Sequence, residues 1–470
     1  MKRIVLAALG LTALVTPSSA QGFSPQELEQ RAIHRRAVEA VIWGMPAVNY
    51  DLMVQAFFKA GGGWNQVVYR SHPSDWKNQT LTPNPDTIYL MPFFNTKDAG
   101  PVVLEIPPAD EGSITGSVDD AWQTALGDVG PAGADKGKGG KYLILPPGYK
   151  DPVPEGYVPL LSSTYQSYAL LRSNFSGRSD AEIARAVAYG KRVKVYPLSQ
   201  AGDPPATTFV DVADRVYDAT IPTDLSFFES LDRIVQAEPW LERDRVMIDM
   251  LKTVGIEKGK PFAPDASKRP VLNNAIGEAR AWIDAKYESM FVPPFFEGRQ
   301  WAVPVAPDLV AGLQSNYAKP AFYPVDSRGT MYAMAFFSAK QLGAGQFYLL
   351  TIRDKDGQPL DGANSYVLRV PANAPVDLYW SVTAYDRQTH ALIRNMPRAS
   401  VASNAAGVRE NPDGSVDISF GPKAPAREEA NWVPTDPQRG FELMLRVYGP
   451  RKEFFDKAWV LPDVERVAAQ

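Results

Sequence analysis

Apolar residues recur at helical spacing soon after the start of the chain. Ser24-Pro25-Gln26-Glu27 is a capping box with proline at the first helical position, and an apolar stripe follows from residue 33 to residue 42. Gly44-Met45-Pro46 interrupts the stripe, and a second helical stretch covers residues 47 to 60, before three glycines. The pattern predicts two helices with a break at Pro46.

Between about residues 64 and 197 the apolar runs become short and rich in β-branched and aromatic residues. Proline or glycine bounds each run, which predicts strands rather than helices. One helix interrupts them, with a capping box at Ser179-Asp180-Ala181-Glu182 and an end at Gly190. The expected strands are residues 102–106, 142–145, 165–172 and 192–196.

Residues 207 to 290 return to helical spacing. Three apolar faces follow one another, over residues 227–235, 246–254 and 272–290, and Gly255 closes the second. This block is typical of a helical connector between two β regions.

The last third of the chain is again β-rich. Apolar and polar residues alternate over residues 415–420 and 441–448, which indicates strands with one buried face. Many short strands with long connections favour a mainly β fold with helical segments, in which two jelly-roll-like β-sandwiches are joined by an α-helical connector. The expected parts are a signal peptide (1–20), N-terminal helices (21–63), a first sandwich (64–206), the connector (207–295) and a second sandwich (296–470).

The first 20 residues resemble a secretory signal peptide. Lys2-Arg3 is basic, residues 4–15 are apolar, and Ser18-Ser19-Ala20 is a small-residue cleavage site. We therefore expect a mature chain that begins at Gln21, is located in the periplasm or secreted, and keeps no stable membrane anchor. The alternative is an uncleaved anchor, although the apolar run is too short to span a bilayer stably.

Composition and charge narrow the classes of function. Hydrophobic residues make up 45% of the 470 positions and charged residues 22%, which fits a globular chain of two domains. Without residues 1–20 the chain has 47 basic and 53 acidic side chains, a formal charge of −6, and no basic patch, which argues against nucleic acid as a partner. Cysteine is absent, so disulfides, thiolate catalysis and cysteine-bound zinc are excluded. The sequence identifies no cofactor.

Histidine, the most frequent general acid or base, occurs only three times. His34 lies beside two arginines in the first helix, so only His72 and His390 could serve a catalytic triad. No HxH or HExxH spacing is present, and the sequence therefore predicts no metal site.

Carboxylates are the better candidates, and Asp86 lies in an unusual string. Asn84-Pro85-Asp86-Thr87-Ile88-Tyr89 follows another proline, Pro83, so that two prolines stiffen a turn. In one interpretation Asp86 is catalytic, or binds a hard cation, while Asn84 and Tyr89 bind the ligand. In the other, which we expect, Asp86 holds the turn by accepting hydrogen bonds from backbone N–H groups.

Asp386 is the second candidate catalytic carboxylate. It follows Trp380 by six residues on one predicted strand, so the two side chains would lie about 20 Å apart on the same face. We therefore expect Trp380 in the core and Asp386 at the end of the strand. A pocket in this region would combine Asp386 with Asn431 and Trp432. Arg446 could bind an anionic ligand or pair with an acidic neighbour.

Several motifs resemble a bacterial pair of domains. Residues 35 to 165 resemble domain of unknown function 1254, and residues 329 to 462 resemble domain of unknown function 1214. This resemblance implies two jelly-roll-like sandwiches joined by helices, often in an oligomer, and implies no settled activity. The motifs that carry it include Asn84-Pro85-Asp86-Thr87-Ile88-Tyr89, Tyr142-Leu143-Ile144-Leu145-Pro146-Pro147-Gly148, Tyr379-Trp380-Ser381-Val382-Thr383-Ala384-Tyr385-Asp386, Asn395-Met396-Pro397-Arg398, Asn431-Trp432-Val433-Pro434 and Arg446-Val447-Tyr448-Gly449-Pro450.

Two functions of different classes remain. The first is a periplasmic enzyme that acts on a small organic or carbohydrate substrate by carboxylate chemistry, with Asp86 or Asp386. The second is a non-catalytic envelope protein that binds a ligand or assembles through its sandwiches. A homo-oligomer is compatible with both.

Overall fold

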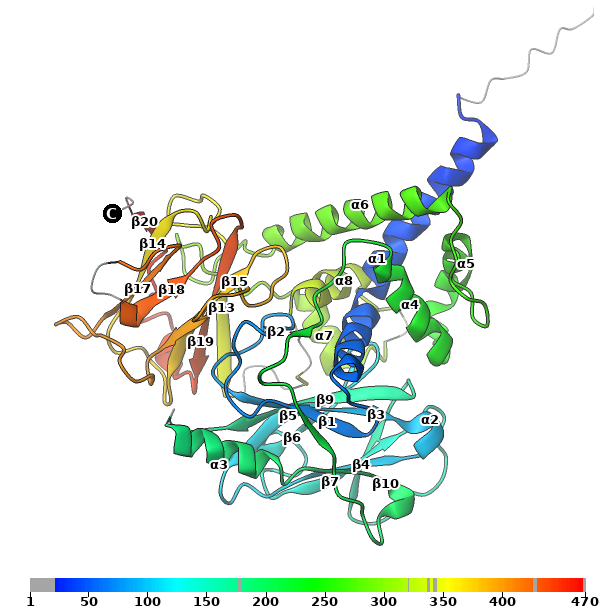
Figure 1. The fold of residues 1–470 in the computed structure, drawn as a ribbon, viewed down its shortest axis with the longest axis horizontal. Coiled ribbons are helices and arrows are strands. Elements are labelled where there is room, and N and C mark those ends of the chain that lie inside the picture. The colour runs from blue at the N-terminus through cyan, green and yellow to red at the C-terminus, as the bar shows by residue number, and fades with distance from the viewer. Residues whose placement is uncertain are drawn as a thin grey trace, which may run out of the picture.

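The protein folds into two β units with a group of helices packed beside them (Figure 1). The computed structural model describes residues 22–175, 177, 179–319, 321–335, 339–340, 345–425 and 429–467. The expected signal peptide and the cleavage before Gln21 lie outside these residues. The chain is mainly β with helical segments, as the sequence predicts. In the described residues, no helix is long and apolar enough to cross a membrane.

The first β unit consists of two sheets that pack face to face. Alternate residues of β3 divide between two cores: Ile88 and Leu90 lie between the sheets, while Tyr89 and Met91 point toward the helices. A small sheet of β2 (Asn78–Gln79) and β12 (Tyr217–Asp218) lies beside them. The six-stranded sheet has the order β11 (Phe209–Asp211), β1 (Gln66–Tyr69), β3 (Ile88–Asn95), β9 (Gln166–Asn174), β5 (Ser113–Asp120), β6 (Ala125–Val129), and the four-stranded sheet the order β10 (Lys194–Pro197), β4 (Val102–Ile106), β7 (Gly140–Leu145), β8 (Tyr157–Leu161).

The second β unit also consists of two packed sheets. Leu349, Val382 and Leu445 of one sheet share a core with Leu368 and Ile418 of the other. The sheets have the orders β13 (Gln346–Thr351), β19 (Phe441–Tyr448), β15 (Trp380–Asp386), β16 (Ser400–Ala402) and β18 (Trp432–Pro434), β17 (Val416–Gly421), β14 (Ser365–Val370), β20 (Glu465–Val467).

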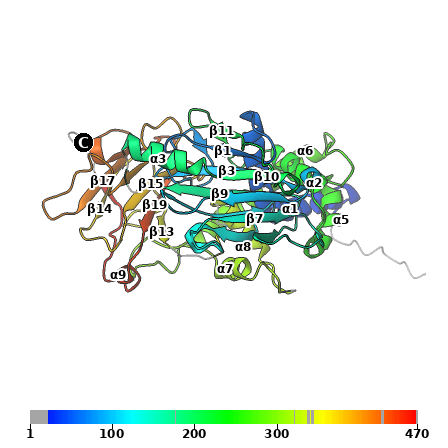
Figure 2. The ribbon, with the colours of Figure 1, turned by 90° about the horizontal axis from the view of Figure 1, so that it is seen from below.

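The long helix α1 (Pro25–Lys59) is the centre of the helical group. Seen from below in Figure 2, the second β unit lies at one end of the molecule and α1, α5 and α6 lie toward the other. The helices that pack with α1 are α4 (Ser226–Ala237), α5 (Arg245–Val254), α6 (Lys268–Ser289) and α8 (Val325–Met334), and α7 (Pro307–Gln314) lies against α8. The remaining helices are α2 (Thr96–Ala99), α3 (Asp180–Gly190) and α9 (Lys452–Phe455).

The predicted break at Pro46 is wrong, because α1 continues through it. Proline lacks the N–H that would bond the carbonyl of Ile42. However, this turn is fully buried, and Gly329 of α8 packs so closely that a Cβ there would lie 2.5 Å from the Ile42 oxygen. A Cβ at Gly44 would lie 2.8 Å from the Leu231 side chain of α4. Packing on both sides therefore holds the helix together where local propensity predicts an end.

Other elements agree with the sequence in part. The capping box of α3 and the left-handed Gly255 after α5 are confirmed. The prediction of helix from residue 207 is wrong for β11 and β12, because β11 pairs with β1 and β12 with β2. The segment expected to form only the second sandwich also contains α7 and α8, and α8 packs on α1.

Candidate ligand-binding site

A cavity of about 780 Å³ lies between the two β units, and segments from both line it. The floor is the face of the six-stranded sheet that points away from the first core. The opposite wall is the corresponding face of β13 and β19, and α8 and the segment before α7 close one side.

The floor has a polar row beside an apolar row. Tyr89 of β3 pairs with Arg172 of β9, and both side chains line the cavity. Met91 and Leu170 also line it, and each lies two residues away on the same strand, so about 7 Å along the sheet. The floor is therefore polar at Tyr89 and Arg172 and apolar at Met91 and Leu170. The cross-strand neighbours Ser117 and Asp128 continue this second row on β5 and β6.

The opposite wall repeats this arrangement. Tyr348 of β13 pairs with Arg446 of β19, and two residues further on Leu350 pairs with Met444. All four line the cavity. The guanidinium carbon of Arg446 lies 5.5 Å from the ring centroid of Tyr348, and that of Arg172 lies 5.5 Å from the ring centroid of Tyr89.

The two guanidinium groups face the same set of tyrosines. Burial opposes the charge of Arg172, but the oxygens of Tyr89, Tyr348 and Tyr448 raise its pKa above the ordinary value. Burial acts on Arg446 in the same way, and Tyr448, Tyr348 and Tyr89 are again among the groups that raise its pKa. Since each arginine interacts with tyrosines of the other β unit, the polar ends of floor and wall face each other.

The tyrosines of this polar end are protonated near neutral pH. Desolvation raises the pKa of Tyr348 and Tyr448, although the charge of Arg446 lowers both. Tyr379 stacks on Tyr448 with ring centroids 4.2 Å apart. The polar end is therefore positively charged and carries phenol hydroxyls that can donate hydrogen bonds.

A loop of the first β unit, residues 79–86, fastens the two units together at this end. Its motif residues contact the motif residues of the second unit. The hydrogen bonds run from Gln79 Nε2 to the Leu392 carbonyl (2.8 Å), from Thr82 N to the His390 carbonyl (2.6 Å), from Tyr385 Oη to the Pro83 carbonyl (2.8 Å), from Asn84 Nδ2 to Tyr448 Oη (2.5 Å) and from Ser400 Oγ to Asp86 Oδ1 (3.1 Å).

Asp86 belongs to this fastening loop and also lines the cavity. The turn is of the Asx type, but Asn84 forms it, since its Oδ1 accepts the backbone N–H of Asp86 at 2.9 Å. The Asp86 carboxylate instead accepts from Ser400 in the other β unit, and only 2% of the residue is exposed. Asp86 therefore connects the units rather than closing the local turn.

Four of the seven residues that the sequence suggested lie together at the cavity. Asn84, Asp86, Tyr89 and Arg446 line it, although the first three come from one β unit and motif and Arg446 from the other. Among the described residues, Asp386, Asn431 and Trp432 are not part of the lining. Thus Asp86 and Asp386 do not meet in this cavity.

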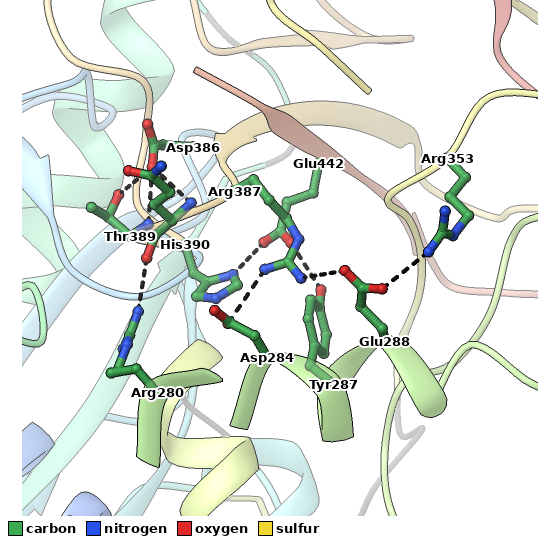
Figure 3. Close-up of polar contacts among 11 residues, drawn as sticks. Arg280, Asp284, Tyr287, Glu288, Arg353, Asp386, Arg387, Thr389, His390 and Glu442 are labelled. Atoms are coloured by element: carbon green, nitrogen blue, oxygen red, sulfur yellow. Dashed lines mark hydrogen bonds and ion pairs between the residues drawn. The ribbon is translucent and has the colours of Figure 1, made fainter. Parts of the chain in front are cut away.

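Asp386 holds a turn at the end of β15 (Figure 3). Its Oδ1 accepts the backbone N–H groups of Gln388 (3.0 Å) and Thr389 (2.9 Å), and Arg439 forms an ion pair with it. Burial opposes the charge, but Arg439 and the backbone donors lower the pKa of Asp386 overall. Trp380 lies in the core of the second unit, 6% exposed, as expected from the strand spacing.

Asn431 and Trp432 are structural as well. Asn431 Nδ2 donates to the carbonyls of Arg409 (2.8 Å) and Asp417 (3.0 Å), and Trp432 Nε1 donates to the carbonyl of Gly421 (3.0 Å). These bonds fix the edge where β18 joins β17.

A buried histidine contacts Glu442 of β19, on the strand face that also carries Met444 and Arg446 (Figure 3). His390 Nδ1 lies 2.8 Å from Glu442 Oε1, and Tyr287 Oη donates to Glu442 Oε2 at 3.0 Å. Tyr287 belongs to α6 and lines the cavity, so this network connects α6 to β19. The described residues contain no group of three or more His, Asp or Glu side chains that could hold a metal ion.

The sequence did not single out Arg172 or Tyr348. Arg172 directly follows the apolar run of residues 168–171, and this is the one signal that could have identified it. Its meaning depends on which face of β9 meets the second β unit, and a single sequence does not contain that information.

Comparisons with known protein families agree with the division of the chain into two β units. A family described as "Protein of unknown function (DUF1254)" matches residues 64–197, and "Protein of unknown function (DUF1214)" matches residues 345–452. No curated protein matches the chain.

Two solved structures resemble the chain over nearly its whole length. The VPA0106 protein from Vibrio parahaemolyticus is 17% identical, with a TM-score of 0.53 over 93% of this chain and 100% of that one. An uncharacterised protein from Burkholderia cenocepacia is 11% identical, with a TM-score of 0.42 over 94% of this chain and 96% of that one. The similarity to the Vibrio protein shows a related fold and nothing about activity.

Proposed function

We propose that this chain, which belongs to the two-domain family that joins DUF1254 to DUF1214, binds a small organic molecule between its two β units. The observation that carries the proposal is the cavity itself, because it is large, mainly apolar and built by both domains of the family. A carbohydrate would require polar partners along its whole length, whereas Met91 and Leu170 are apolar and Ser117 beside them already donates to Asp128. We therefore favour an apolar ligand over a sugar.

Location and architecture belong to the same proposal. We propose that the protein is exported to the periplasm, which the basic start, the apolar run and the Ser18-Ser19-Ala20 site support. We also propose jelly-roll-like connections within each β unit, supported by the mixture of short antiparallel strands and long connections. Association into a homo-oligomer remains a proposal that rests on the family resemblance.

An enzyme is the second candidate. It is favoured by one observation, the presence of the Asp86 carboxylate in the cavity lining. In such an enzyme Asp86 would act as the general acid or base without Asp386, which lies outside the lining.

Titration with a neutral apolar dye, Nile red, tests whether the cavity binds ligands. Ala335 lines the cavity, so Ala335→Trp should fill part of it and weaken dye binding by about tenfold or more, a loss of roughly 1.4 kcal/mol. Ala266 is exposed and outside the lining, and Ala266→Trp is the matched control. Failure of the native protein to bind Nile red, or equal binding by both variants, would contradict the proposal.

A further inference from the structure

We infer that the ligand of this cavity is a carboxylate with an apolar body, and that its carboxylate lies between Arg172 and Arg446. The inference rests on the proposed function, because it specifies the ligand of the same cavity. It is carried by the two guanidinium groups, the donors around them, and the apolar surface next to them.

The first argument is charge. Within the described residues, neither Arg172 nor Arg446 forms an ion pair with a carboxylate, although both face the same tyrosines. Two like charges that face one site, with no carboxylate paired directly to either, are unfavourable away from water. An anion between them would remove this repulsion.

The second argument is hydrogen bonding. Arg446 is held in place, since it donates to Thr383 Oγ1 (2.9 Å) and to the Thr82 carbonyl (3.1 Å). Arg172 Nε, in contrast, has no acceptor among the described residues, and Arg172 lines the cavity. A planar carboxylate can accept two parallel bonds from one guanidinium and further bonds from phenol hydroxyls.

The third argument is the shape of the surface next to the arginines. The apolar pairs Met91–Leu170 and Leu350–Met444 lie about 7 Å along the strands from the polar pairs. Met331 and Met334 of α8 extend this surface. Methionine side chains adapt to irregular apolar shapes. A body of methylene groups or an aromatic ring therefore fits beside the charged head.

The presence of Asp86 favours a monoanion. Asp86 lines the same cavity and influences Tyr448, which also faces both arginines. The described lining contains three arginines, Arg70, Arg172 and Arg446, and two aspartates, Asp86 and Asp128. One excess positive charge is left, which a carboxylate ligand cancels and a phosphate dianion would exceed.

Competition against bound Nile red tests the inference with matched acids and alcohols. The pairs are decanoate with 1-decanol, and 2-naphthoate with 2-naphthylmethanol, added to the full chain. In at least one pair we expect the acid to bind at least about tenfold more tightly than the alcohol, since hydrogen bonds to charged groups are worth roughly that much or more. Arg172→Gln should abolish the preference, which is measured against the Nile red affinity of the same variant.

The control is Arg369→Gln, which removes an exposed arginine that pairs with Asp417 far from the lining and should keep the preference. Absence of any acid preference in both pairs, with Nile red still bound, would overturn the inference and leave the proposed function standing. An unchanged preference in a folded Arg172→Gln protein would also overturn it. No Nile red binding by the native protein would instead contradict the proposed function.

Discussion

At the scale of single residues, the cavity depends on side chains that join the two β units as well as on side chains that would meet a ligand. Asn84, Asp86 and Tyr89 come from one motif, and Tyr379, Arg446 and Tyr448 from two others. Asn84 and Asp86 both bond side chains of the second unit. The motifs that identify the two domains therefore meet one another at the interface.

Asp86→Asn should lower the free energy of unfolding by about 1–2 kcal/mol, because a buried charged acceptor loses strength in its bond to Ser400. Chemical denaturation measures this difference. Ser400→Ala is the matched variant on the partner side and should have a smaller effect of the same sign. A stability equal to that of the native protein, together with loss of ligand binding, would assign Asp86 a direct functional role instead.

At the scale of elements, buried contacts between helices and strands decide features that local sequence does not. Glu238 follows the end of α4 and accepts the backbone N–H groups of Tyr165 (2.6 Å) and Gln166 (3.0 Å) at the start of β9. Burial raises the pKa of Glu238 to about 7, and these two donors only partly offset the effect. The folded state therefore binds the proton of Glu238 more tightly than the unfolded state does.

Stability should consequently fall as the pH rises from about 4.5 to 7, by roughly 3 kcal/mol from this residue alone. Glu238→Gln removes the titrating group, so the free energy of unfolding of the variant should lose this slope. Denaturant titrations of both proteins at pH 5, 6, 7 and 8 compare the two curves. Parallel curves would show that the pKa of Glu238 is close to its unfolded value.

The contact of α8 with α1 gives a second prediction for an element. Gly329→Ala should destabilise the protein by about 2–4 kcal/mol, because the new Cβ would overlap the backbone oxygen of Ile42. Gly277 of α6 is a glycine in a helix with open space around it, and Gly277→Ala should stabilise by about 0.5–1 kcal/mol. Thermal unfolding of the Gly329→Ala and Gly277→Ala variants tests the close contact between α8 and α1. Equal effects of the two substitutions on stability would contradict this contact.

The same elements show how far sequence alone reaches. The strand β19 and the helix α4 could be predicted from periodicity, although the face of β19 that was expected to be exposed is buried too. The second half of α1 and most of α8 are buried on all sides and have no apolar stripe. The sequence predicted the former as a helix but placed a break before it, and it missed the latter. Short strands such as β11 exist because of a distant partner, which periodicity does not reveal.

At the scale of the whole molecule, the site exists only where two β units meet. The sequence singled out Asn84, Asp86, Tyr89 and Arg446, but paired Asp386 with Asn431 and Trp432. Each candidate residue could be identified from its own motif. The arrangement of these residues in space depends on how residues 79–86 contact the outer face of β19 and β15. Arg172 was missed for the same reason, since its partners are Tyr348 and Tyr448 of the other unit.

A crystal structure of the full chain with 10-bromodecanoate tests the central claim most directly, because the anomalous signal of bromine locates one end of the ligand. We expect the carboxylate between Arg172 and Arg446, and the bromine beside Met91, Leu170 and α8. A ligand bound outside the cavity, or one whose bromine lies at the arginines, would contradict the account.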